Sequence, residues 1–447
     1  MRGAYAKYEP ALLAICAVIL AAQILIPPFI GIADNGDFPK IAGPLSLGPK
    51  NGPANFIYFV ADYVRAPRYL WQSQTWSTEL PLAWLSSLVA GAAFDIRWLG
   101  ALHAVLFLCA FYVLLRSLRA LTPWRAILIA VAAMGIFTDV VYVAYFNSFF
   151  TDTAALLGLL LATAAAVQIA VKGFHRGSAI LFSLAALLFI GSKPQHAIWG
   201  FLFAGFVVLA GGKRGIAAAM VLIGASVVTV RLAPPDYSFP PLFTLTFSKL
   251  ARSGPTPQEV LRELGLREED AAFVGMHAFM PQVPAYDSEW RRDFLRKINY
   301  GVILKWYMRH PLRAIEILND TLRDETAQMR PSNLSNFRQQ DGHPPGARTN
   351  QFAVWSSLRS ALYERWPYHM LVWYLLVIAG SIRSIFWLEN PTQALLGWIA
   401  LGVAALAIGE FSVSALADAA ETYRHLFIFH VCTDISICLA FAAGLNP

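Results

Sequence analysis

The sequence predicts an all-α polytopic membrane protein, and three observations on its 447 residues support this prediction. Hydrophobic residues make up 57% of the chain and charged residues only 14%, whereas a soluble globular domain carries about 25% charged residues. Apolar runs close to the roughly 20 residues that cross a bilayer as a helix recur along the chain. The charges are too few to cover a soluble protein of this size, and the composition also excludes a disordered chain or a coiled coil.

Ten of these apolar runs are candidate transmembrane helices. They cover residues 10–31, 98–115, 126–146, 153–171, 178–192, 196–211, 215–233, 368–388, 392–411 and 425–445. An eleventh run, residues 80–94, is ambiguous because it is short and is flanked by Glu79 and Asp95. The chain is therefore expected to have about ten transmembrane helices, or eleven if 80–94 crosses.

The basic residues decide between these two topologies. If 80–94 stays at the membrane surface, both termini are cytoplasmic, and the cytoplasmic segments carry ten Lys or Arg against only Glu9 and Glu389. If 80–94 crossed, the cluster of Arg116, Arg119 and Arg125 would lie outside, against the positive-inside rule. Ten spans with both termini inside are preferred.

This topology divides the chain into three parts. Residues 1–233 form an N-terminal transmembrane module with a first outer loop at 32–97, residues 234–367 a mostly helical extracytoplasmic segment, and residues 368–447 the C-terminal transmembrane helices. In the first loop, residues 54–66 are expected to form an amphipathic interfacial helix. In the outer segment, Thr256-Pro257 followed by Glu259 predicts a helix start, and two further helices are expected at 288–308 and 311–328.

The net charge of +7 does not indicate nucleic-acid binding. The outer segment is nearly balanced, with 17 Lys and Arg against 15 Asp and Glu. The excess lies mainly in the membrane portion, where the positive-inside bias explains it. The expected partner is therefore the lipid bilayer, and no nucleic acid is expected.

The first candidate site is Asp34-Asn35-Gly36-Asp37-Phe38-Pro39-Lys40, directly after the first span. Gly36 permits a tight turn that brings Asp34 and Asp37 together beside Lys40. Paired carboxylates suit general-base catalysis or a divalent cation. The alternative is an ordinary Asn-Gly turn between helices.

Two further candidates lie in short outer turns. Asp152 ends the YFNSFFTD loop; it either caps the following helix or positions a ligand, and the two roles are compatible. Lys193, Gln195 and His196 lie in the GSKPQH turn between the fifth and sixth spans. A lysine on the outer side opposes the charge bias, and with its two neighbours it suits phosphate binding. The alternative is a lysine that snorkels from a helix end.

The fourth candidate is Tyr423-Arg424-His425 at the outer entry of the last span. Arg424 is a second phosphate ligand in this interpretation. The alternative is that Arg424 pairs with Asp418 or Glu421.

Two acids lie inside predicted spans. Asp139 and Asp434 are functional candidates because an ionisable group within the membrane is costly. Asp434 also has threonine, serine and cysteine neighbours, so a hydrogen bond between helices is the alternative role.

Together, acids and cations from four loops collect on one membrane face in the predicted topology. A phosphate with a long apolar tail fits this arrangement, because the tail would lie between helices and the head group would meet Lys193 and Arg424. An acid of the first loop would deprotonate an acceptor hydroxyl, and the cations would stabilise the leaving phosphate. The predicted chemistry is glycosyl transfer from a lipid-phosphate donor with inversion.

The order of these features resembles the GT-C superfamily of polytopic glycosyltransferases. An acidic motif (DNGDFPK) follows the first span, a second one (YFNSFFTD) lies in the next outer loop, and a long outer loop precedes the last spans. The GDF, SKPQ and TYRH elements look most like bacterial members that build cell-surface glycans.

The resemblance implies several further properties. The donor would be a polyprenyl-phosphate sugar and the acceptor a glycan or a lipid-linked glycan. The membrane would be the bacterial inner membrane, with the active site facing the periplasm. The first-loop acid would be the base, either Asp37 or Asp34, and the GDF context favours Asp37. A WWDYG-type motif is absent from the sequence, so no metal site and no obligatory cofactor are expected, although a divalent cation remains compatible.

Two other functions fit part of the pattern. A transporter or flippase of a lipid-linked or anionic solute explains the membrane charges, but it explains less well a folded outer segment, and inverted repeats are absent from the sequence. A ligase or polymerase that uses a lipid-diphosphate glycan differs mainly in its donor.

Overall fold

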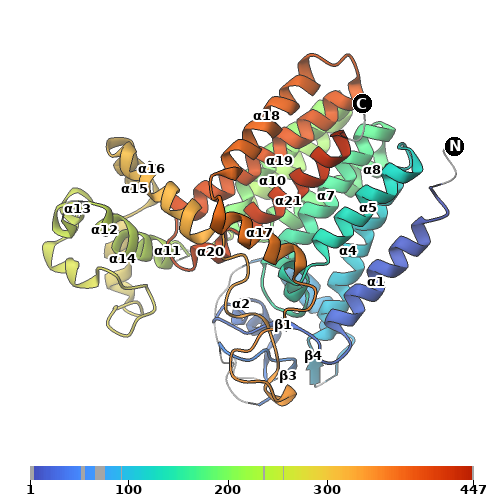
Figure 1. Ribbon diagram of the computed structural model, residues 1–447. Coiled ribbons are helices and arrows are strands. Elements are labelled where there is room, and N and C mark those ends of the chain that lie inside the picture. Colours follow the sequence, from blue (N-terminus) through green and yellow to red (C-terminus); the bar gives the residue numbers. More distant parts are fainter. Residues whose placement is uncertain are drawn as a thin grey trace.

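The computed structural model describes residues 5–51, 56–65, 76–91, 93–234, 237–254 and 256–444. It consists of a bundle of long helices with a smaller group of helices beside it (Figure 1). The first and last described residues, 5 and 444, lie at the same end of the bundle. We call the opposite end the outer end.

Each of the ten predicted spans overlaps a helix of the bundle. These helices are α1 (Glu9–Ile24), α4 (Arg97–Leu118), α5 (Pro123–Phe137), α7 (Asp152–Lys172), α8 (Arg176–Ile190), α9 (Gly200–Gly211), α10 (Ile216–Arg231), α18 (His369–Phe386), α19 (Pro391–Leu416) and α21 (Phe427–Gly444).

Five helical stretches are long and apolar enough to cross a membrane: Arg97–Leu118, Asp152–Lys172, Pro194–Arg231, His369–Phe386 and Pro391–Leu416. The pair Pro123–Phe137 and Val140–Asn147, bent by 54°, makes a sixth if it is one span. The apolar helices α1, α8 and α21 are shorter. Membrane-spanning helices are therefore confirmed, whereas the count of ten stays a prediction.

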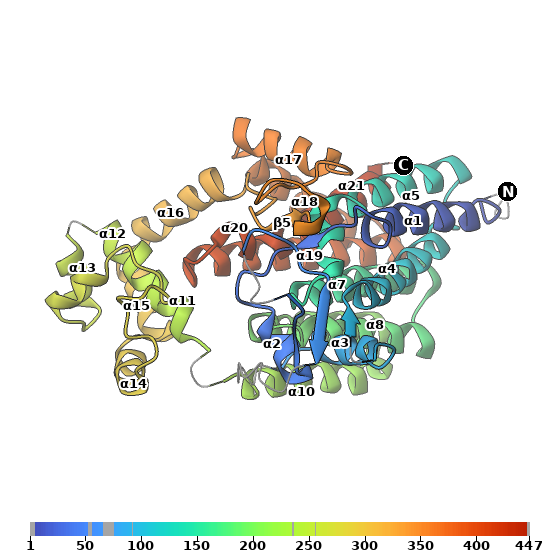
Figure 2. The same ribbon diagram turned by 90° about the horizontal axis from the view of Figure 1, so that it is seen from below.

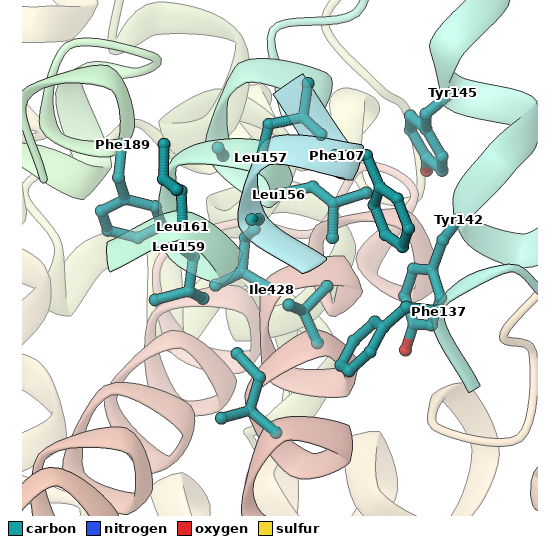
Figure 3. Packing of buried hydrophobic residues seen from close by; sticks show 14 of the residues in the cluster. Phe107, Phe137, Tyr142, Tyr145, Leu156, Leu157, Leu159, Leu161, Phe189 and Ile428 are labelled. Atoms are coloured by element: carbon teal, nitrogen blue, oxygen red, sulfur yellow. The ribbon is translucent and has the colours of Figure 1, made fainter. Parts of the chain in front are cut away.

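Helix α7 lies at the centre of the bundle. It is rich in alanine and leucine, and most of its residues are buried against α4, α8, α19 and α21. A Cβ on Gly158 would lie 2.6 Å from the backbone nitrogen of Phe189, so the small residue is what allows α7 and α8 to approach closely. Figure 3 shows Leu156, Leu157 and Leu159 of α7 packed among neighbours such as Phe107 of α4. A rigid α7 fixes Asp152, its first residue.

The first outer loop contains one short helix, α3 (Glu79–Ser87). Nine residues at about 1.5 Å each reach less than half of a hydrocarbon core of about 30 Å. The chain then continues as strand β4 (Ala93–Asp95). The ambiguous run 80–94 is therefore too short as a helix to cross.

The interfacial helix predicted at 54–66 is wrong for the residues that are described there, 56–65. They form bends followed by strand β3 (Asp62–Arg65), which pairs with β2 (Leu47–Pro49) and β4. Tyr63 is buried against Phe94 and Phe149, so cross-strand packing of an aromatic residue outweighs the helical periodicity. Residues 54, 55 and 66 lie outside the described residues.

The outer segment begins with a separate group of short helices, which we call the outer subdomain (residues 237–254 and 256–320). It contains α11 (Phe239–Thr244), a π-helix (Leu245–Leu250), α12 (Ala251–Ser253), α13 (Pro257–Glu263), a 3₁₀ turn (Glu268–Phe273), α14 (Ser288–Lys297), α15 (Tyr300–Arg309) and α16 (Pro311–Asp320). These elements surround their own hydrophobic core, which includes Phe243, Phe294 and Trp306.

The helix start at Thr256 is confirmed, because the Thr256 side chain accepts the N–H of Glu259 at the start of α13. The helix predicted at 288–308 is instead two helices, α14 and α15. Ile298 is extended, and the side chain of Asn299 caps α15 by accepting the N–H of Val302.

The rest of the outer segment returns to the bundle. Strand β5 (Leu334–Asn336) pairs with β1 (Gly31–Ile32), and α17 (Val354–Arg365) leads into α18. Viewed from below in Figure 2, β1 and β5 lie at the outer end of the bundle. Because only Ala33 separates β1 from Asp34, this pairing anchors the loop that carries the first candidate site.

Candidate functional site

The two carboxylates of the first loop have different surroundings. The Oδ1 atom of Asp34 accepts the N–H groups of Gly36 (2.8 Å) and Phe38 (3.1 Å), which closes a tight turn. Gly36 has φ +98°, a conformation that suits glycine. Burial raises the pKa of Asp34 above its ordinary value, although the N–H bonds oppose this. Asp34 therefore shapes the turn that carries Asp37.

Asp37 is held between two cations. Its Oδ1 lies 2.5 Å from Lys40 Nζ, and its Oδ2 lies 2.6 Å from an Arg424 guanidinium nitrogen. Burial alone would raise the pKa of Asp37, but Lys40 and Arg424 outweigh it and hold this pKa well below its usual range. Asp37 is therefore an ionised carboxylate. Its contact with Arg424 joins two residues that are 387 positions apart in the sequence.

Asp152 forms a second ion pair, at the start of α7. Lys193 Nζ donates to both carboxylate oxygens, at 2.7 and 2.8 Å. The Lys193 side chain is only 13% exposed, so it does not snorkel away from the protein. Instead, the extended backbone of Lys193 ahead of Pro194 turns the side chain toward Asp152.

Arg424 lies in the short helix α20 (Thr422–His425). It contacts both the loop of Asp37 and the loop that ends at Asp152. Its Nε lies 2.9 Å from Glu421 Oε2, and its guanidinium lies over the ring of Phe150. The Asn35 amide also donates to Glu421 at 2.8 Å. The predicted alternative, a pairing with Glu421, is thus present together with the contact to Asp37.

These ion pairs line one pocket of about 520 Å³ that is open to solvent. It contains seven of the predicted site residues: Asp37, Lys40, Asp152, Lys193, Gln195, Arg424 and His425. The remaining lining residues are Phe149, Phe150, Thr151, Ser192, Pro194 and Tyr237. Four loops that are distant in sequence therefore meet at the outer end of the bundle.

Three predicted site residues do not line the pocket. Asp34 is used in its turn, as described above, and Tyr423 is partly buried next to Arg424. His196 is fully buried, where its Nδ1 lies 2.8 Å from the hydroxyl of Ser192 and its ring stacks on Phe189. His196 thus supports the turn that presents Lys193.

Two residues near the pocket escaped the sequence reasoning. Tyr237, the first described residue of the outer subdomain, lines the pocket without belonging to any motif. Glu410 of α19 is buried and accepts hydrogen bonds from Trp199 (2.6 Å) and Gln195 (3.2 Å). Glu410 was detectable, because an acid inside an apolar span is a functional candidate.

A partly open apolar cavity of about 440 Å³ lies between α7, α8, α9 and α19. Its lining on α7 begins at Leu159 and ends at Ala166. Since a helix rises about 1.5 Å per residue, the cavity starts about 10 Å along α7 from Asp152. The apolar cavity therefore follows the polar pocket along α7, on the side away from the outer end.

The pocket acids face cations rather than one another. Among the described residues, no three His, Cys, Asp or Glu side chains gather so that they could hold a metal ion. Lys40, Lys193 and Arg424 supply the positive charge of the site, which suits an anionic ligand.

A family model described as the YfdI N-terminal transmembrane domain matches residues 3–447, nearly the whole chain. No curated protein and no solved structure matches the chain. The match agrees with the long apolar helices of the bundle, and together they identify an integral membrane protein.

Proposed function

We propose that this chain, which belongs to the family of the YfdI N-terminal transmembrane domain, is a membrane glycosyltransferase. It would move a sugar from a polyprenyl-phosphate donor to an acceptor hydroxyl at the outer end of the bundle. The observation that carries this proposal is the convergence of Asp37, Asp152, Lys193 and Arg424 in one pocket.

The cations suit a phosphate that gains charge during the reaction. A sugar on a polyprenyl phosphate is a phosphodiester with one negative charge, and the departing lipid monophosphate carries a second one. Arg424 and Lys193 would therefore bind the transition state more strongly than the substrate, which is the requirement for catalysis. Arg424 offers the planar fork of donors that fits phosphate oxygens.

Asp37 would be the general base. While Lys40 and Arg424 hold its pKa low, Asp37 is a poor proton acceptor. A bound phosphate competes for Arg424, which would return the pKa of Asp37 toward its ordinary range. The acceptor oxygen then attacks the anomeric carbon, the carbon–phosphate oxygen bond breaks with its electron pair on the phosphate, and Asp37 takes the hydroxyl proton. A single displacement inverts the anomeric centre.

The apolar cavity supports a donor with a lipid tail. With its phosphate at Lys193, a polyprenyl chain would descend along α7 into the space between α7, α9 and α19. The resemblance to bacterial GT-C enzymes adds the location: the inner membrane, with the pocket on the periplasmic side, in cell-surface glycan assembly.

The test is transfer by the purified chain in proteoliposomes that contain polyprenyl-phosphate sugars and a panel of glycan acceptors. Lys193→Ala is expected to lose about 10²–10³-fold in transfer, the effect of removing one charge-stabilising group. Asp37→Asn is expected to lose about 10²–10⁴-fold, the contribution of a general base. Lys213→Ala, an exposed lysine between α9 and α10, serves as the matched control.

Three outcomes would overturn the proposal. Undiminished transfer by both site variants would show that Asp37 and Lys193 do not take part in the reaction. Movement of the donor across the vesicle membrane without bond cleavage would identify a flippase. Transfer from lipid-diphosphate donors alone would identify a ligase or polymerase.

A further inference from the structure

The outer subdomain exposes a stripe of large apolar side chains on α15 and α16. Leu304 and Met308 of α15 are 59% and 65% exposed, and Leu312 and Ile315 of α16 are 72% and 60% exposed. The spacings of four and three residues place each pair on one helix face. We call these four residues the α15–α16 stripe.

The opposite faces of both helices are buried. Ile303 and Trp306 of α15, and Ile317 of α16, pack into the core of the outer subdomain. Both helices therefore have two apolar faces, and only one of them is used by the subdomain itself. Single exposed apolar residues are normal, but a contiguous set usually marks an interaction surface.

A hydrogen bond fixes where the stripe points. Asn319 lies on the same face of α16 as Leu312 and Ile315, since the three positions follow the i, i+3, i+7 pattern. The hydroxyl of Tyr368 donates to Asn319 at 2.8 Å, and Tyr368 directly precedes α18. The stripe-bearing face of α16 therefore meets the bundle at the outer end of α18.

The exposed surface of α18 continues from this point with Leu371, Val372 and Leu375, which are 55%, 58% and 67% exposed. These residues belong to a candidate span, so we expect lipid around them. Trp366 and Tyr368, both about half exposed, are the residue types that occupy the membrane–water interface. The stripe is thus continuous with a lipid-facing surface through an interfacial aromatic pair.

The arrangement of the helices agrees with this placement. Figure 1 shows α15 and α16 beside the bundle, with α16 running across the direction of α18 rather than along it. The exposed Lys305 and Arg309 accompany the stripe on α15. An apolar face with basic residues at its side is typical of a helix that lies in the membrane surface.

We propose that the α15–α16 stripe inserts into the outer-end leaflet of the bilayer, so that the outer subdomain is anchored in the membrane surface. Tyr237 of this subdomain lines the pocket, and Lys249 binds the loop before Arg424. The lipid contact therefore holds the subdomain at the height of the pocket.

The test is depth-dependent fluorescence quenching in lipid vesicles with the full chain. Met308→Cys is labelled with an environment-sensitive dye in a background in which the exposed Cys109 is replaced by Ala. Spin-labelled phospholipids are expected to quench the dye several-fold more than a dye on Glu269→Cys, an exposed acid of the same subdomain. The measurement needs no transferase activity, so it stands apart from the proposed function.

Equal quenching at both positions would overturn the proposal. Crosslinking of two copies through Met308→Cys without quenching by lipid would also overturn it, in favour of self-association. In a second variant, Leu312→Glu with Ile315→Glu is expected to reduce quenching at position 308 to the level of position 269, because it replaces the apolar face with charge.

Discussion

The ion pairs of the polar pocket and an ion pair between α17 and α21 differ in their surroundings. In the pocket, Asp37 and Lys40 remain 23% and 41% exposed at the side chain and face a cavity. Within the bundle, Arg359 of α17 pairs with Asp434 of α21, and these side chains are only 4% and 0% exposed. We call this second ion pair, together with its hydrogen-bond partners, the sealed network.

The sealed network is satisfied by its own neighbours. Asp434 also accepts hydrogen bonds from the hydroxyl of Tyr142 and from the indole N–H of Trp355, the latter at 2.9 Å. A guanidinium nitrogen of Arg359 donates to the hydroxyl of Tyr363. Such a network fixes α17 against α21, and its residues line neither the polar pocket nor the apolar cavity.

The comparison qualifies the rule that an acid within the membrane is functional. Asp434 fits the predicted alternative of a bond between helices. Asp139 similarly caps α6 (Val140–Val143) by accepting the N–H of Val141 and also accepts the N–H of Ser356, both at 3.0 Å. What Asp37 and Asp152 share, and what Asp434 and Asp139 lack, is a place in the lining of the polar pocket, which a ligand can enter.

The largest expected effect breaks the sealed network. Arg359→Met leaves Asp434 buried without its cation and is expected to cost about 3–5 kcal/mol. Lys193→Met is expected to cost clearly less, because water in the pocket can hydrate Asp152. Thermal unfolding in detergent measures both variants. Adding Asp434→Leu to Arg359→Met should restore part of the loss, and an equal cost for the two single variants would contradict the comparison.

The fold was predictable where composition and helix periodicity decide it. Long apolar runs identified the membrane helices, and Thr256 identified the start of α13. Strand β3 was missed because its partners, β2 and β4, lie elsewhere in the chain and no local signal reveals the pairing. The break between α14 and α15 was missed although Asn299 carries a recognisable cap.

The sequence predicted which loops form the site, but it did not predict the contacts between their side chains. Motifs and charge bias singled out seven residues that line the pocket. They did not reveal that each acid already holds a cation, since Asp37 and Arg424 meet only in the folded chain. Tyr237 carries no signal at all, because its role depends on how the outer subdomain meets the bundle.

A smaller effect separates the two carboxylates of the first loop. Asp34→Ala removes the acceptor of two backbone N–H groups and is expected to cost about 1 kcal/mol. Asp34→Asn keeps an acceptor oxygen and should retain most of both stability and transfer. Unfolding in detergent and the transfer assay provide the two measurements. Loss of transfer in Asp34→Asn at unchanged stability would move the catalytic role from Asp37 to Asp34.

The smallest effect concerns Lys249, a partly buried cation whose hydrogen-bond acceptors are uncharged. Lys249 Nζ donates to the carbonyl oxygens of Ala415 (3.0 Å) and Asp418 (2.9 Å) and to the hydroxyl of Thr422 (3.0 Å), which fixes the loop before Arg424. Without a bonded carboxylate, burial dominates and lowers the pKa of Lys249 to about 8. The cation is therefore tolerated less well in the fold than in the unfolded chain, where the pKa of lysine is about 10.4.

Between pH 8 and pH 10 the unfolded chain binds more protons at this group, so stability rises with pH, and the cost of the buried charge is fully present only below pH 8. From pH 7 to pH 8 the expected gain is about 0.4 kcal/mol. Lys249→Met should lack this gain, which thermal unfolding at the two pH values measures as a difference from the unmodified chain. An identical pH dependence in both proteins would contradict this prediction. It would show that the neutral oxygens around Lys249 compensate the burial of its charge as fully as Asp434 does for Arg359.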